Sequence, residues 1–145
     1  MQSDLLHDRV GLTNGCFDLL HVGHVRYLKA AKNRVDILIV AINSDESVRS
    51  LKGEGRPVIP LDERMEVVAA LESVDFVLSF SDRTCRKVIA RLEPDLYIKG
   101  GDYDPETLPE WKTVQEIGGQ VEFIPVTISR SSSQIIEEIL SSHHI

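Results

Sequence analysis

The sequence predicts one α/β domain built on a doubly wound sheet of five parallel strands, in the order 3-2-1-4-5. Apolar runs alternate with amphipathic segments along the 145 residues, which is typical of buried parallel strands joined by helices. The length and the apolar content of 42% suit a single core, so residues 1–145 are expected to form one domain. Right-handed crossovers then lead to the predicted strand order.

In the first half of the chain, residues 10–13, 37–43 and 74–80 are the apolar runs predicted as strands. A strand buried on both faces reads as such a continuous run. Helices are predicted between them at residues 22–32 and 61–72, where apolar side chains recur at helical spacing.

The second half repeats the alternation. A helix is predicted at residues 84–92, a strand at 96–99, a helix at 105–117, a strand at 121–126 and a helix at 131–140. Several of the predicted helices have Pro, Asp or Ser near the start, which favours a helix N-terminus. The chain has no internal repeat and no low-complexity linker that would divide it.

The segment His21-Val22-Gly23-His24 lies at the start of the first predicted helix. Its two imidazoles share one face, close to backbone N–H groups that lack intrahelical partners. A polyphosphate gains hydrogen bonds and a favourable dipole there. Histidine can donate a hydrogen bond or carry a proton toward charge that develops on phosphorus, and Gly23 leaves room for a base or ribose. The segment predicts a phosphate site, with packing or capping by the histidines as the alternative.

Four polar segments follow strands of the predicted sheet. They are residues 14–24, 43–52, 99–103 and 129–133, after strands 1, 2, 4 and 5. Ligands of open α/β sheets bind at the carboxyl ends of the strands, near the reversal of strand order. We therefore expect the four segments to share one cleft.

The last of these segments opens the final predicted helix with Arg130, Ser131, Ser132 and Ser133. Hydroxyls and backbone amides at a helix start can cap the helix and can also receive phosphate oxygens. Capping needs only one of the three serines, so the triplet with its arginine favours a phosphate role.

The stretch Asn14-Gly15-Cys16-Phe17-Asp18, followed by H-x-G-H, resembles the cytidylyltransferase-like family of nucleotidyltransferases, whose signature is G-x-F-D and then H-x-G-H. The resemblance covers about residues 9–140. Within the family, further segments look like the D-glycero-β-D-manno-heptose 1-phosphate adenylyltransferases. These are Asn43-Ser44-Asp45, Leu51-Lys52-Gly53, Arg56-Pro57, Arg64, Lys99-Gly100-Gly101-Asp102-Tyr103 and Ser131-Ser132-Ser133. The family usually has Ser-Thr-Thr at the last position, so this chain keeps the hydroxyls without the β-branching.

The resemblance implies transfer of AMP from ATP to a sugar 1-phosphate, with release of pyrophosphate. The catalytic residues it implies are His21, His24, Arg64 and Lys52. The nucleotide contacts it implies are Cys16, Phe17, Gly23, Lys99, Asp102, Arg130, Ser131, Ser132 and Ser133. The contacts to the phosphorylated substrate are Asn14, Asp18, Asn43, Asp45 and Arg56. A simple turn explains Asp102 nearly as well.

Mg²⁺ is expected to accompany the triphosphate, held mostly by phosphate oxygens and water, because no carboxylate cage is evident in the sequence. Accordingly, no protein residue is predicted as a metal ligand. A homodimer is expected from the small size and the resemblance. A separate sugar kinase would have to supply the sugar phosphate.

The formal net charge of −7 argues against a sequence-independent nucleic-acid binder. The longest apolar run, residues 37–42, is far shorter than the roughly 20 residues that cross a bilayer, and the N-terminus lacks a signal-peptide pattern. Cys16 and Cys85 are too few for a disulfide framework, which fits a reduced compartment. We therefore expect a cytoplasmic protein without nucleic-acid or membrane partners.

Other functions stay open at this point. Related enzymes couple CTP to glycerol 3-phosphate or ethanolamine phosphate, or ATP to FMN, and residue spacing alone does not separate adenine from cytosine. A non-catalytic nucleotide-binding module is a further alternative, although both histidines and the flanking basic residues are intact. A fragment of a class I aminoacyl-tRNA synthetase, with its related H-x-G-H, does not fit the size and charge.

Overall fold

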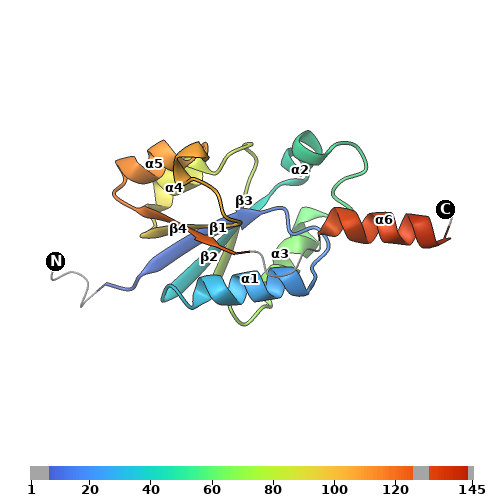
Figure 1. The fold of residues 1–145 in the computed structure, drawn as a ribbon, viewed down its shortest axis with the longest axis horizontal. Coiled ribbons are helices and arrows are strands. Elements are labelled where there is room, and N and C mark those ends of the chain that lie inside the picture. The colour runs from blue at the N-terminus through green and yellow to red at the C-terminus, as the bar shows by residue number, and fades with distance from the viewer. Residues whose placement is uncertain (1–6, 126–130, 144–145) are drawn as a thin grey trace.

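The computed structural model, which describes residues 7–125 and 131–143, confirms the predicted sheet (Figure 1). Five parallel strands pair in the order β3-β2-β1-β4-β5. The strands are β1 (Val10–Gly15), β2 (Ile37–Asn43), β3 (Phe76–Phe80), β4 (Leu96–Gly100) and β5 (Gln120–Ile124). Each predicted strand is therefore present, with ends that differ by a few residues.

Six α-helices and one short 3₁₀ helix are found in the described parts of the chain. They are α1 (Val22–Lys32), α2 (Asp45–Lys52), α3 (Leu61–Ala69), α4 (Arg86–Leu92), η2 (Pro105–Thr107), α5 (Trp111–Glu116) and α6 (Ser132–His143). None of these helices is long and apolar enough to cross a membrane.

Two helix predictions differ from the structure. Helix α2 was not predicted, yet Ser44 caps it through a bond from Ser47 N to its Oγ, and two acidic residues occupy its first turn. The helix predicted at residues 105–117 is divided into η2 and α5, with Pro109 between them, because proline does not continue a helix beyond its first turn.

The core has two layers because alternate strand residues point to opposite faces of the sheet. On β2, for example, Leu38, Val40 and Ile42 belong to one buried cluster and Ala41 to the other. Helices α1 and α3 cover the first face, and α4 and α5 cover the second (Figure 1). The sheet is thus shielded from water on both sides, as a parallel sheet requires.

Strands β1 and β4 meet where the strand order reverses. Six residue pairs join β1 to β2, but only Gly11 with Leu96 and Leu12 with Tyr97 join β1 to β4. Beyond these pairs β1 and β4 are no longer paired with each other, so a crevice opens between their carboxyl ends. This is the position at which open α/β sheets bind ligands.

Candidate functional site

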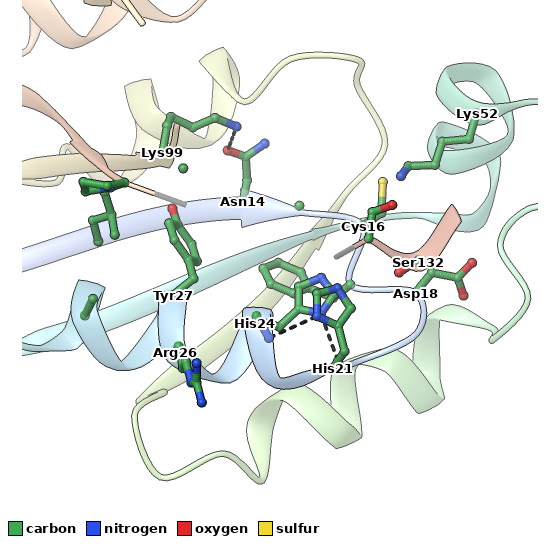
Figure 2. A pocket seen from close by; sticks show the side chains of 18 of the residues that line it. Asn14, Cys16, Asp18, His21, His24, Arg26, Tyr27, Lys52, Lys99 and Ser132 are labelled. Atoms are coloured by element: carbon green, nitrogen blue, oxygen red, sulfur yellow. Dashed lines mark hydrogen bonds between the residues drawn. The ribbon is translucent and has the colours of Figure 1, made fainter. Parts of the chain in front are cut away.

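A cavity of about 560 Å³ lies at the carboxyl end of the sheet (Figure 2). Its lining comes from the end of β1 and the segment after it, from α1 and the turn that follows, from the ends of α2, β4 and β5, and from the start of α6. The lining residues are Asn14, Gly15, Cys16, Phe17, Asp18, His21, Gly23, His24, Arg26, Tyr27, Ala30, Arg34, Lys52, Lys99, Gly100, Ile124, Pro125, Ser131 and Ser132. The four polar segments expected to share a cleft each contribute to it.

His21 and His24 cap helix α1 reciprocally. His21 is the N-cap residue, and its Nδ1 accepts a bond from Gly23 N at 3.0 Å. Nδ1 of His24 accepts a bond from His21 N at 3.2 Å, and the two ring centroids are 4.0 Å apart. An Nδ1 that accepts a bond carries no proton, so each neutral ring carries its proton on Nε2. The helix start therefore fixes both imidazoles as Nε2–H donors, and the capping and functional interpretations describe the same geometry.

The electrostatic surroundings keep His24 neutral. Burial lowers the pKa of His24 to about 4, and His21 and Lys52 add to the shift. At neutral pH this imidazole therefore acts as a hydrogen-bond donor and carries no charge. Of the two roles considered for the histidines, donation of a hydrogen bond is the one that fits His24.

Positive charge in the cavity comes from side chains outside the histidine pair. Lys52 is the last residue of α2, and Lys99 Nζ lies 3.2 Å from Asn14 Oδ1 near the end of β4. Sequence reasoning missed Arg26 and Arg34, which also line the cavity. Arg26 is exposed, whereas Arg34 pairs with Glu122. The spacing of Arg26 from Gly23, three residues along α1, is the signal that would have identified it, whereas Arg34 lies beyond the end of this helix.

The start of α6 closes one side of the cavity with serine hydroxyls that already have protein partners. Ser131 exchanges two bonds with Gln134, which makes a capping box. Ser132 Oγ contacts both N and O of Leu19 at 3.3 Å, and Ser133 Oγ accepts from Arg56 Nη1. Ser131 and Ser132 reach the cavity wall; Ser133 does not line it.

The described residues contain no group of three His, Cys, Asp or Glu side chains that could hold a metal ion. Burial raises the pKa of the Cys16 thiol, which lies 3.9 Å from Asn43 Oδ1. A protonated thiol is a poor nucleophile and a poor metal ligand. Cys16 thus contributes shape and backbone to the cavity.

Comparison with known proteins agrees with this geometry. The family model described as cytidylyltransferase-like matches residues 12–145. The chain belongs to the cytidylyltransferase-like family. The resemblance identified from the H-x-G-H segment is thereby confirmed.

Among curated relatives of this cytidylyltransferase-like chain, the bifunctional protein HldE of Shewanella amazonensis is 52% identical over 142 residues, or 98% of this chain. HldE of Citrifermentans bemidjiense is 52% identical over 135 residues, or 93% of this chain. The chain spans 30% and 28% of the lengths of these two relatives.

Solved structures share the fold at lower identity. A lipopolysaccharide core biosynthesis protein from Thermoplasma volcanium superposes with a TM-score of 0.71 at 23% identity, covering 86% of this chain and all of that one. Pantothenate synthetase from Thermus thermophilus gives a TM-score of 0.60 at 16% identity, covering 88% of this chain and 61% of that one. At these identities both structures support the fold alone.

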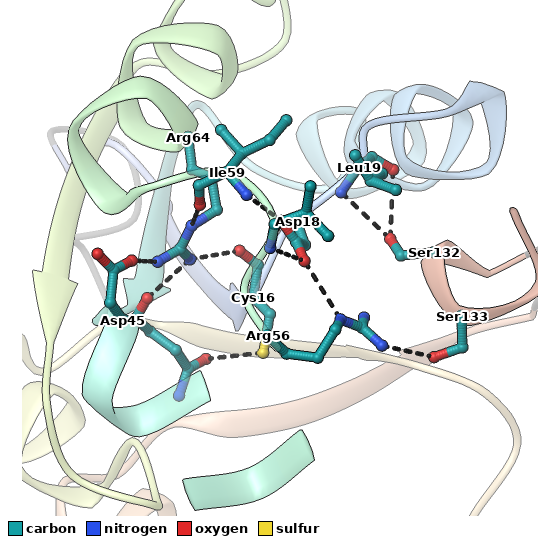
Figure 3. A network of polar contacts seen from close by, with 11 residues as sticks. Cys16, Asp18, Leu19, Asp45, Arg56, Ile59, Arg64, Ser132 and Ser133 are labelled. Atoms are coloured by element: carbon teal, nitrogen blue, oxygen red, sulfur yellow. Dashed lines mark hydrogen bonds and ion pairs between the residues drawn. The ribbon is translucent and has the colours of Figure 1, made fainter. Parts of the chain in front are cut away.

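Several residues predicted to contact ligand also belong to a polar network at the cavity (Figure 3). Arg64 is 1% exposed and does not line the cavity. Its guanidinium donates to the carbonyl oxygens of Ile59, Cys16 and Asn43 at 2.7–2.8 Å, and to Asp45 Oδ1 at 2.6 Å. These bonds occupy all three guanidinium nitrogens. In this conformation Arg64 ties α3 to the ends of β1 and β2.

Asp18 and Arg56 belong to the same network. The Asp18 carboxylate accepts bonds from the backbone N of Val58 and Ile59 at 2.9–3.0 Å, and Arg56 Nε lies 3.4 Å from it. Asn43 is also buried, and its Nδ2 donates to Ser47 Oγ. The structure therefore gives Asp18, Asn43, Asp45 and Arg56 partners within the protein, and among the described residues Arg56 Nη2 is buried without one.

The nucleotide contacts of Asp102 and Arg130 stay predictions. Asp102 is exposed and is not among the cavity-lining residues. Arg130 lies outside the described residues. Phe17 lines the cavity with a positive φ of 49°, and its ring centroid is 5.4 Å from that of His24. The aromatic ring thus packs beside the imidazole in a tilted arrangement.

Protonation of His24 is expected to destabilise the fold. The pKa of this imidazole is about 4 when folded, against 6.5 for an ordinary histidine. Between these pH values the unfolded chain binds the proton and the native state does not, so stability rises with pH across this window. Asn in place of His24 keeps an acceptor for His21 N but does not titrate.

Thermal unfolding at pH 4.5 and pH 7 measures this effect. The wild-type Tm should fall more on acidification than that of His24→Asn. Equal Tm losses in the two proteins would contradict the shifted histidine.

Proposed function

We propose that this chain is an adenylyltransferase, which transfers AMP from ATP to a sugar 1-phosphate and releases pyrophosphate. The favoured acceptor is D-glycero-β-D-manno-heptose 1-phosphate. The observation that carries the proposal is the pair of Nε2–H donors, fixed by the helix start in a cavity that also holds Lys52 and Lys99. Membership of the cytidylyltransferase-like family and 52% identity to HldE proteins support it.

The reaction is an in-line displacement at the α-phosphorus of ATP. An oxygen of the acceptor phosphate forms the new P–O bond, and the bond from the α-phosphorus to the bridging oxygen breaks. The acceptor phosphate is already an anion at neutral pH, so the attack needs no general base. This suits imidazoles whose Nδ1 atoms are engaged and whose Nε2 atoms already carry protons.

Charge stabilisation is the main task left to the protein. Negative charge builds on the equatorial oxygens and on the departing pyrophosphate. His21 and His24 would donate hydrogen bonds to it, and the ammonium groups of Lys52 and Lys99 would neutralise it. The nucleotide would lie against Gly23, Phe17 and the start of α6. Contacts from Asp102 and Arg130 stay predictions.

We propose that Mg²⁺ enters with the nucleotide as the MgATP substrate. The charged and titratable side chains that line the cavity are mainly cations and imidazoles that present N–H groups. The Asp18 carboxylate already accepts bonds from two backbone N–H groups. Such a set does not fit a resident divalent cation, which prefers several oxygen ligands.

Arg64 and its partners take a positioning role in this proposal. By holding the carbonyls of Cys16 and Asn43, Arg64 fixes the ends of the two strands that carry the site. Its predicted contact with substrate phosphate is replaced by this indirect role. The homodimer, the cytoplasmic location and the separate sugar kinase stay predictions.

A panel assay for pyrophosphate release tests the function. ATP and CTP are each paired with heptose 1-phosphate, glycerol 3-phosphate, ethanolamine phosphate and FMN, with Mg²⁺ present. We expect the highest kcat/KM with ATP and heptose 1-phosphate. Faster turnover with CTP would overturn the adenylyl preference, and release with no pair would favour a nucleotide-binding module.

A further inference from the structure

Tyr97 lies in β4 with no exposed surface, yet its hydroxyl reaches a residue of the cavity wall. It lies 2.6 Å from Asn14 Oδ1. The same oxygen is 3.2 Å from Lys99 Nζ, and Figure 2 shows this second contact. A lysine ammonium can only donate, so the amide atom that faces it is the oxygen. In the structure the Tyr97 hydroxyl is the second donor to this oxygen, so both of its lone pairs are used. The Glu110 carboxylate is a further hydrogen-bond partner of the same hydroxyl.

The strand geometry explains why these three side chains meet. Tyr97 and Lys99 are two positions apart on β4 and share one face of the sheet, and Nζ lies 5.9 Å from the centre of the Tyr97 ring. Asn14 ends the adjacent strand β1, where the ladder to β4 has stopped. The tyrosine hydroxyl thus bridges a gap that backbone hydrogen bonds no longer close.

One consequence is a wall that offers only donors. Because the Asn14 side-chain oxygen faces Tyr97 and Lys99, the amide nitrogen Nδ2 points away from Lys99 (Figure 2). Among the described residues, this nitrogen has no hydrogen-bond partner. The Lys99 ammonium has further protons to donate. A group rich in acceptors, such as a phosphate, is the complement of this end of the cavity.

We infer that Tyr97 is a positioning residue, which acts through Asn14 to hold the Lys99 ammonium and the Asn14 N–H groups toward a bound phosphate. The inference rests on the proposed function, because that function supplies two phosphate sources, ATP and the sugar phosphate. Tyr97 itself does not line the cavity.

The surroundings of the phenol suit a permanent donor. Burial and the nearby Glu110 carboxylate raise the pKa of Tyr97, so the hydroxyl keeps its proton at any working pH. Glu110 is itself buried and accepts a bond from Cys85 N at 3.0 Å. Glu110 thereby lies between Tyr97 of β4 and Cys85, which directly precedes α4.

The substitution Tyr97→Phe tests this role because it removes one oxygen and keeps the ring. Calorimetric titration without turnover would measure the Kd of ATP, pyrophosphate and heptose 1-phosphate separately. Loss of the hydrogen bond from Tyr97 to Asn14 should raise the Kd of the ligand whose phosphate lies at this end of the cavity by about 3- to 10-fold. The ligand whose Kd rises identifies the source of the phosphate that binds there.

A double-mutant cycle separates positioning from general destabilisation. If Tyr97 acts through Asn14, Tyr97→Phe should have little further effect on Kd in an Asn14→Ala background. Val114→Ala is the matched control, since Val114 is buried in the same core cluster as Tyr97 and lies outside the cavity. It should lower Tm and leave each Kd unchanged.

Two results would overturn the inference. One is a folded Tyr97→Phe protein, checked by circular dichroism, that binds all three ligands as the wild type does. The other is an equal loss of affinity with and without Asn14. If the wild-type protein binds the phosphate ligands but releases no pyrophosphate, the proposed function is refuted. The double-mutant cycle would still test the role of Tyr97, because it measures binding alone.

Discussion

Replacing His24 with Asn is expected to lower kcat by about 10²- to 10⁴-fold while leaving the fold intact. The Asn side-chain oxygen can take the place of Nδ1 and accept the bond from His21 N, so the capping box survives. What is lost is the Nε2–H donor, which the proposed reaction needs only as charge develops. ATP affinity should therefore change much less than kcat.

His24→Ala completes this experiment because it removes the cap as well as the donor. Loss of a cap costs about 1 kcal/mol, so this variant should lose Tm in addition to kcat. His7→Asn is a suitable control, since His7 pairs with Asp95 and does not line the cavity. A His24→Asn protein with unchanged kcat would show that the histidine only caps the helix.

Removing Arg64 should have the largest effect on stability. Arg64→Ala leaves the carbonyls of Ile59, Cys16 and Asn43 without their side-chain donor in a site where the arginine is 1% exposed. We expect a loss of about 3–5 kcal/mol in the free energy of unfolding, as for other buried polar networks broken from one side. The Asp45 bond contributes less because that carboxylate is 41% exposed.

Urea unfolding of two further variants sharpens the Arg64 prediction. Arg64→Lys keeps the charge but has one nitrogen in place of the three of the guanidinium. Most of the loss in the free energy of unfolding should therefore remain. Arg49→Ala, at an exposed position of α2, should change stability by less than about 0.5 kcal/mol. An Arg64→Ala protein as stable as the wild type but inactive would restore the prediction of direct contact with substrate.

The apolar alternation of the chain was enough to predict the five strands and their order, because a parallel sheet with right-handed crossovers admits few arrangements. The same reasoning brought the segments after β1, β2, β4 and β5 to one edge. His21, His24, Lys52 and Lys99 line the cavity there. Helix α2 was missed because its eight residues carry only a short apolar stripe beside charged ones.

Sequence by itself determined which residues gather at the carboxyl edge, since strand direction and helix position follow from local patterns. Only the tertiary structure decided which way their side chains point. Arg64 and Asp18 turn toward carbonyls and N–H groups from distant loops, which no spacing encodes. Tyr97 falls within a strand predicted from the sequence, and its bond to Asn14 forms where the pairing of β1 with β4 has ended at Leu12. Hydrogen-bond satisfaction in a buried site depends on which chain segments pack together, and that is a property of the folded molecule.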